Sequence, residues 1–137
     1  MVRMNCDMKK IGILLLIAGL GLVFEASGQA EIFAPMKDAI KAGNAKELAK
    51  FFNQTVDVNL EGEVNTYSKA QAEFVLRDFF KKNPPSDFSI VHTGSSKGGL
   101  QFAIANFKSS SNQFNTLIRV KQSESTYLIH EISFVKE

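Results

Sequence analysis

Residues 87–135 read DFSIVHTGSSKGGLQFAIANFKSSSNQFNTLIRVKQSESTYLIHEISFV and contain four runs in which apolar residues alternate with others. Alternation with a period of two is typical of a half-buried strand, because successive side chains point to opposite faces of a sheet. Short segments rich in Gly and Ser separate the runs, at 94–99, 109–112 and 122–125. Because such links permit hairpins but not the long crossover between parallel strands, the stretch predicts an antiparallel meander.

Three helices and two short strands are predicted ahead of the meander. Helical spacing of apolar residues predicts helices over 32–42, 44–53 and 68–82, and Ser68 with Gln71 forms a capping box. Residues 55–60 alternate as a strand, Glu61-Gly62 can turn it, and 63–67 is the return strand. The order is therefore ααββαββββ. We expect an α+β domain, a cone-like half-barrel in which three helices pack on one face of a curved antiparallel sheet of about six strands.

The first 30 residues are predicted to be a secretory signal peptide, which leaves residues 31–137 as a single domain. A basic start (Arg3, Lys9, Lys10) precedes an apolar run over 11–24, and small residues follow as a signal peptidase requires. The alternatives are an uncleaved anchor or a buried helix, but the run is short for a membrane span. We expect an exported protein, periplasmic or secreted, with no stable membrane insertion after cleavage.

Composition argues against several kinds of site. Cys6 is the only cysteine and precedes the apolar run, so the mature chain has no disulfide, thiol nucleophile or thiolate metal site. The 16 Lys and Arg against 14 Asp and Glu give no electrostatic reason to expect nucleic acid as a partner. We expect no metal, no cofactor and no catalytic residue set.

Four residues are candidate ligand-binding positions: Tyr67, His92, Lys97 and His130. Both histidines fall in phase with apolar neighbours, on the first and last strands of the meander, about 14 Å apart across three strand spacings. That separation is too large for one metal ion, so they are interpreted as core or rim residues or as pocket acid–base groups. The segment 94–99 lacks the phosphate-loop order and joins two strands, so it is interpreted as a hairpin loop in which Lys97 is the anion-binding candidate.

Phe74 falls on the side of the third predicted helix opposite its apolar face. It is interpreted either as a tolerated surface residue or as a residue that another helix or a partner covers.

A family resemblance adds to this reading. The runs FFKKNPP (79–85), HTGSSKGG (92–99) and YLIHEI (127–132), with Phe88, resemble a family of small exported bacterial proteins of unknown function. The order of elements resembles the nuclear transport factor 2-like, or cystatin-like cone, superfamily. The resemblance implies a scaffold shared by isomerases, dehydratases, transport adaptors and binding domains, so it does not determine function. It supplies no catalytic residues for this chain.

Three functions stay open on the sequence. The first is an exported non-enzymatic binding module that holds a small apolar or amphipathic ligand in the cone or a protein on its sheet. The second is a small isomerase- or dehydratase-type enzyme in which His92, His130 or Tyr67 acts as acid or base. The third is a scaffold subunit whose phenylalanine side chains fill the cone.

A homodimer packed sheet to sheet is also expected, because several strands are apolar on both faces. Ala103, Ala105 and Phe107 oppose Phe102 and Ile104, while Ile129 and Val135 oppose Leu128 and Ile132. One face of the sheet contacts the helices, so the other would expose apolar side chains in a monomer. Contiguous apolar surface of this kind commonly marks a protein interface.

Overall fold

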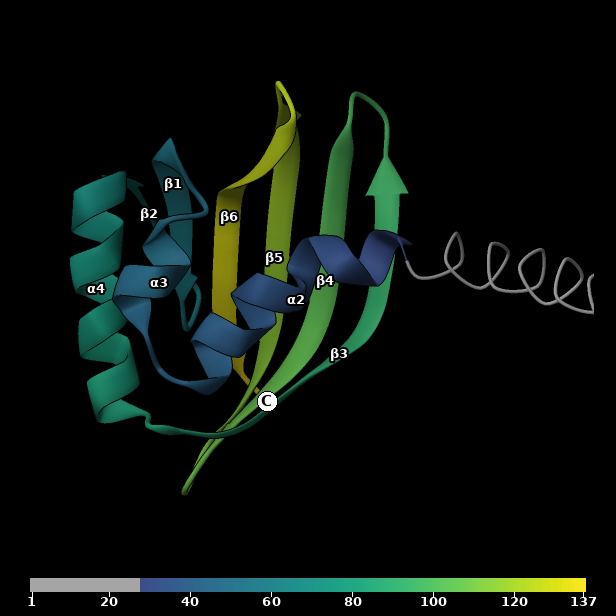
Figure 1. The fold of residues 1–137 in the computed structure, drawn as a ribbon. Coiled ribbons are helices and arrows are strands. Elements are labelled where there is room, and N and C mark those ends of the chain that lie inside the picture. The colour runs from purple at the N-terminus through teal and green to yellow at the C-terminus, as the bar shows by residue number, and fades with distance from the viewer. Residues whose placement is uncertain (1–27) are drawn as a thin grey trace, which may run out of the picture. The chain divides into compact units, whose positions relative to one another are not determined.

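Three helices and six strands make up residues 28–137, the part of the chain that this computed structural model describes (Figure 1). The elements are α2 (Gly28–Lys41), α3 (Ala45–Ala49), β1 (Phe52–Leu60), β2 (Glu63–Ser68), α4 (Lys69–Lys82), β3 (Pro85–Ser96), β4 (Leu100–Ser109), β5 (Gln113–Ser123) and β6 (Thr126–Lys136). This is the predicted order. The predicted signal peptide lies outside the described residues, except that residues 28–30 belong to the first turn of α2.

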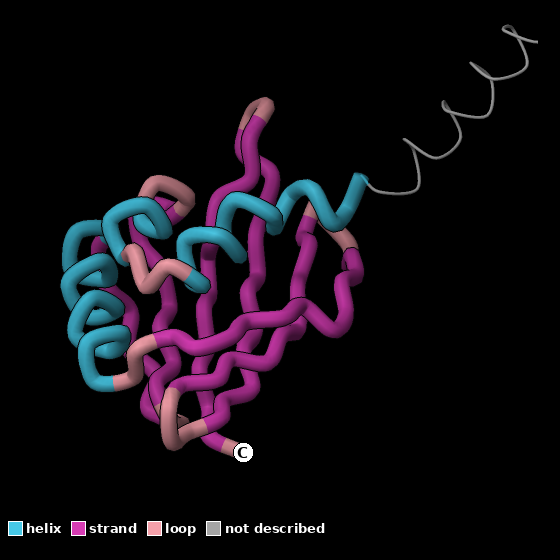
Figure 2. The backbone as a smooth tube through the Cα atoms, turned by 60° about the horizontal axis from the view of Figure 1, so that its bottom comes forward, coloured by secondary structure: helices cyan, strands magenta, loops and turns pink. Residues whose placement is uncertain are grey.

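The strands form one curved sheet in the order β2-β1-β6-β5-β4-β3, and the helices lie on a single face of it (Figures 1 and 2). The predicted meander is confirmed, because β3, β4, β5 and β6 pair successively and antiparallel. One pair departs from the expected antiparallel pattern: β1 runs parallel to β6. The chain between them is long enough to allow this, since it contains β2, α4 and most of the meander.

Local signals start and stop the elements largely where the sequence predicts. Gly43 has φ +65° after the end of α2, and the Asn44 side chain accepts a hydrogen bond from the Glu47 amide. Ser68 and Gln71 form the predicted capping box of α4. The second predicted helix is too long, however, because α3 ends at Ala49 and β1 begins at Phe52. Pairing with β6 explains the difference: the Ile129 amide donates to the Phe51 carbonyl at 2.6 Å.

Two β-bulges change which side chains face the helices. Val91 is an extra residue between the pairs Ile90–Ala105 and His92–Ile104, and His130 is an extra residue between the pairs that Ile129 and Glu131 make with β5. Each bulge shifts the alternation of its strand by one residue.

The bulges explain two differences between the structure and the expectations from the sequence. Ile129 and Ile132 are both fully buried, whereas strict alternation puts them on opposite faces. His92 pairs with the exposed Ile104, so it is not in phase with the buried Phe88.

Aromatic rings fill the concave side of the sheet beneath α4. The Phe79 ring centroid lies 4.8 Å from that of Phe134 and 5.3 Å from that of Phe114. Phe80 and Phe107 also contact this group, and all five side chains are buried. Phenylalanine side chains therefore occupy the part of the cone where a ligand pocket was expected.

Candidate functional site

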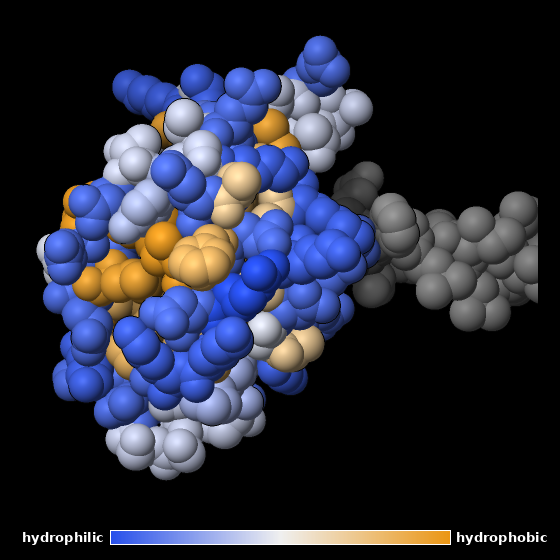
Figure 3. Space-filling model, turned by 90° about the vertical axis from the view of Figure 1, so that its left-hand side faces the viewer, coloured by the Kyte–Doolittle hydropathy of each residue, from blue (hydrophilic) through white to orange (hydrophobic). Residues whose placement is uncertain are grey.

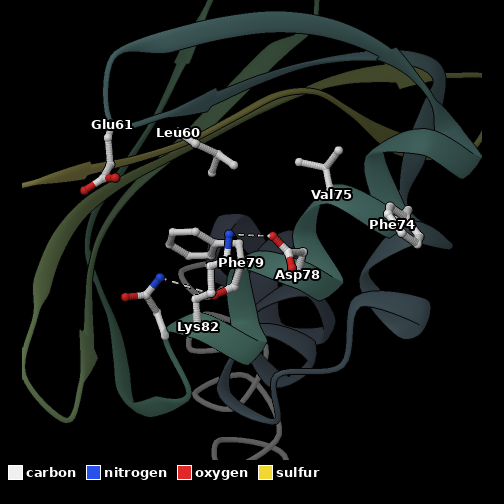
Figure 4. Close-up of a pocket in the computed structure, with 8 residues that line it drawn as sticks. Leu60, Glu61, Phe74, Val75, Asp78, Phe79 and Lys82 are labelled. Atoms are coloured by element: carbon white, nitrogen blue, oxygen red, sulfur yellow. Dashed lines mark hydrogen bonds and ion pairs between the residues drawn. The ribbon is translucent and has the colours of Figure 1, made fainter.

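The flank of the domain that carries α4 has a hollow whose lining is mainly apolar (Figure 3). Its volume is about 280 Å³, and its lining consists of the apolar residues Leu60, Phe74, Val75 and Phe79 and the polar residues Glu61, Asp78, Lys82 and Asn83. Figure 4 shows Leu60 on the strand side of the hollow, with Val75 and Phe79 opposite it on α4. The buried Phe79 forms the floor, so the hollow lies directly over the phenylalanine cluster.

A second, smaller hollow of about 120 Å³ continues along the same flank on the sheet side. Its lining consists of Val58, Leu60, Glu63, Asn65 and Tyr67, so the two hollows share Leu60. We call the two together the flank groove. One wall is α4 and the other is the β1–β2 hairpin, whose tight turn is made by Glu61 and Gly62, both with positive φ. The groove thus lies between α4 and this hairpin, at the end of the sheet where β2 is the terminal strand.

Phe74 stands at the edge of the groove with its side chain 69% exposed. Its neighbours on the helix explain this position, since the buried face of α4 is made by Ala72, Leu76, Phe79 and Phe80. Phe74 lies outside that stripe and finds no cover in the described part of the chain. Exposure of one large apolar residue beside an apolar hollow distinguishes this flank from ordinary surface.

The rim of the groove is acidic. Lys82 forms an ion pair with Asp78 at 3.1 Å, and Lys136 forms one with Glu61 at 3.5 Å. Glu63 has no ion-pair partner among residues 28–137. The groove therefore combines an apolar floor with one carboxylate that no described cation neutralises.

The four predicted candidates do not converge on one site. Tyr67 lines the flank groove on β2, whereas His92 lies on β3 at the opposite edge of the sheet. His92 is exposed and its ring centroid is 5.9 Å from that of Phe102. Lys97 is exposed in the β3–β4 turn, and His130 is half-buried at the bulge of β6. Three strand spacings separate the two histidines, as expected from the meander.

Residues 28–137 contain no cluster of three or more His, Cys, Asp or Glu side chains placed to hold a metal ion. None of the helices in this range is both long enough and apolar enough to cross a membrane. The chemistry that the groove offers is apolar contact and carboxylate charge.

Sequence reasoning missed most of the groove residues. Leu60 and Val75 belong to the predicted strand 55–60 and the predicted helix 68–82, and both are partly buried and packed against the core, so nothing in their patterns distinguishes them from ordinary core residues. Phe74 carried a usable signal, because its position on the helical wheel already marked it as exposed. Glu63 carried no such signal in the sequence, since an acidic residue after a turn is common.

A family model described as "Domain of unknown function (DUF4783)" matches residues 33–135. The chain belongs to the DUF4783 family. Its fold agrees with that of a solved DUF4783 protein from Bacteroides ovatus, which is 28% identical with a TM-score of 0.73 over 76% of this chain and 94% of that one. No curated protein matches the chain. In the solved Bacteroides protein the matched region is nearly the whole chain, so that region is folded there without a further large domain.

The DUF4783 domain also shares its fold with more distant proteins. One is a nuclear transport factor 2-like protein of unknown function from Shewanella baltica, with 12% identity and a TM-score of 0.63 over 84% of this chain and 95% of that one. Another is a domain of unknown function with a cystatin-like fold from Nostoc punctiforme, with 15% identity and a TM-score of 0.62 over 82% and 76%. The predicted superfamily is thus confirmed at the level of fold.

Proposed function

We propose that this DUF4783 domain is an exported, non-enzymatic binding module and that the flank groove is its binding site for an apolar or amphipathic group. The observation that carries the proposal is the exposed Phe74 beside an apolar hollow of about 280 Å³. Burial of a phenylalanine side chain by a partner contributes about 1.5–3 kcal/mol. Export rests on the basic start, apolar run and small residues of the first 30 positions.

The groove is a better candidate than the cone for this role. The rings of Phe79, Phe107, Phe114 and Phe134 occupy the concave side under α4, whereas the flank groove opens to solvent. Ligand pockets for whole small molecules usually measure about 300–1,000 Å³. A hollow of about 280 Å³ falls just below that range and accommodates one part of a ligand, such as a side chain or a short acyl segment.

The positions of the acid–base candidates favour binding over catalysis. General acid–base chemistry needs groups within hydrogen-bond reach of one reacting centre. Tyr67 lies at one edge of the sheet and His92 at the other, with His130 on a strand between them. An isomerase- or dehydratase-type reaction would have to use one of these groups alone.

The test uses residues 31–137 and Nile red, a neutral apolar dye whose fluorescence rises in apolar surroundings. We expect the dye to bind the parent protein, and Phe74→Ala to weaken binding by about tenfold, as the loss of part of a phenylalanine contact implies. The matched control is Val91→Ala, since Val91 is 58% exposed on β3, at the edge of the sheet opposite β2. Equal dye binding by all three proteins, or no binding at all, would remove the groove as the site.

A second role is supported by the outer face of the sheet. Ile104 is 40% exposed at the centre of β4, and it pairs with the half-buried Leu117 on β5 and with His92 on β3. The half-buried Phe102 and Leu128 extend this apolar area. We propose that a second copy of the chain covers it in a homodimer packed sheet to sheet, in line with the expectation from the two-faced strands.

A further inference from the structure

We propose that the flank groove takes an extended peptide that adds as a strand to the free edge of β2, with apolar residues in the groove and basic residues at its rim. The inference rests on the proposed role of the groove as a binding site. It adds the chemical class of the partner and the backbone geometry of its recognition.

The backbone of β2 presents unpaired groups at the edge of the sheet. β2 is the terminal strand, and Leu60 pairs with Glu63 across the two-residue turn. The Glu61 amide donates to the Phe134 carbonyl of β6 at 2.8 Å, so the backbone groups of Leu60 point the other way, toward Glu63. Because hydrogen-bonded and non-hydrogen-bonded pairs alternate along an antiparallel ladder, the amides and carbonyls of Val64 and Thr66 point away from β1.

The free segment has a defined end. The Ser68 amide is already engaged, since it donates to the Gln71 side-chain oxygen at 3.2 Å in the capping box of α4. Two residues, Val64 and Thr66, thus offer two donors and two acceptors in the spacing that an added strand requires.

The same strand directs alternate side chains toward the groove. Glu63, Asn65 and Tyr67 line the smaller hollow together with the buried Val58. Every second residue of a peptide beside β2 would lie on this side of the sheet, next to Glu63, Asn65 and Tyr67 at the end of the groove. Main-chain hydrogen bonds would supply part of the affinity, and the larger hollow, whose lining includes Leu60, Phe74 and Val75, would favour apolar side chains.

Charge complementarity selects basic residues for the flanking positions. Three carboxylates line the groove, those of Glu61, Glu63 and Asp78, against the single cation of Lys82. Lys82 and Lys136 each form an ion pair with one of these carboxylates, so Glu63 is the carboxylate that no cation among residues 28–137 pairs with. A second copy of β2 is a poorer occupant, because its sequence EVNTYS brings another Glu63 and no cation.

The experiment measures binding of a capped hexapeptide of alternating valine and lysine to residues 31–137 by calorimetry. The control peptide has the same composition in two blocks, VVVKKK, and should bind at least about tenfold more weakly, since it cannot place apolar groups on one side and charges on the other. Binding of both peptides with equal affinity would show charge attraction only and would overturn the proposal.

The decisive protein variant is Val64→Pro, and Val64→Ala is its matched control. Both remove the exposed valine side chain, but only proline removes the outward amide, and proline is tolerated at an edge whose N–H faces solvent. We expect Val64→Ala to bind the alternating peptide nearly as the parent does and Val64→Pro to bind it about tenfold more weakly. Glu63→Gln should also weaken binding and reduce its dependence on salt.

The outcomes separate this inference from the proposed function of the groove. If the two Val64 variants bind equally while Phe74→Ala still weakens Nile red binding, strand addition is wrong and the groove stands. If Val64→Pro fails to fold, the test uses methylated peptides instead. N-methylation of the alternate peptide amides that would donate to β2 should abolish binding, whereas N-methylation of the amides that point away from β2 should not. Equal binding of the two methylated peptides contradicts the proposal.

Discussion

At the scale of the residue, Thr116 is an unusual member of the core. It is 2% exposed on β5, and its hydroxyl oxygen has no hydrogen-bond partner among the described residues. Its register partners are Ala105 and Phe134, so its immediate surroundings are apolar. A buried hydroxyl without a partner costs roughly 1–3 kcal/mol of desolvation that nothing offsets.

Thr116→Val is therefore expected to stabilise the domain. Valine has nearly the same shape and lacks the hydroxyl, so the free energy of unfolding should rise by about 1 kcal/mol in urea denaturation. The control is Thr66→Val, because the Thr66 hydroxyl is exposed and donates to the Asp57 carboxylate at 2.6 Å. A loss of stability in Thr116→Val would show that the hydroxyl has a partner, such as a buried water molecule.

At the scale of the element, helix α4 links stability to the groove. Ser68 accepts a hydrogen bond from the Gln71 amide at 3.3 Å and so begins the helix directly at the end of β2. The buried stripe of the helix then packs on the phenylalanine cluster, and its outer side carries Phe74. One cap thus orients a helix that serves both the core and the proposed site.

Ser68→Ala should lower the free energy of unfolding by about 1 kcal/mol, the usual effect of removing a helix N-cap. Ser68→Asp retains an acceptor at this position and should restore most of that loss. Both are measured by thermal or urea unfolding. In the folded protein Nile red binding should remain close to that of the parent, because Ser68 does not line the groove. Equal stability of the Ala and Asp variants would contradict a capping role.

At the scale of the whole molecule, the two exposed surfaces lie on different parts of the domain. The flank groove is at the β2 edge, and the apolar area around Ile104 is on the outer face of β4 and its neighbours. A homodimer through the outer face would therefore leave the groove accessible in both copies. The two proposals are compatible and can be tested separately.

Sedimentation of residues 31–137 at tens of micromolar should show twice the mass of one chain. Ile104→Lys places a charge in the proposed interface and should give a monomer, since an unpaired buried charge is costly. Phe74→Lys puts the same charge on the exposed flank and should leave the dimer intact. A monomer for the parent protein at this concentration would remove the dimer proposal.

The sequence by itself determined the order of the elements, most of their boundaries and the confirmed fold class, because these depend on local signals. Alternation marks the strands, Ser68 with Gln71 caps α4, and Gly43 and Glu61-Gly62 mark turns. Tertiary structure alone decided that β1 pairs in parallel with β6 and that β1 starts early. It also decided on which face of the sheet the side chains of His92 and Ile132 lie. Strand pairing between distant segments and the two bulges set these features, and neither leaves a periodic trace in the chain. The flank groove is also a tertiary property, since its lining comes from two separate segments of the chain, the β1–β2 hairpin and α4.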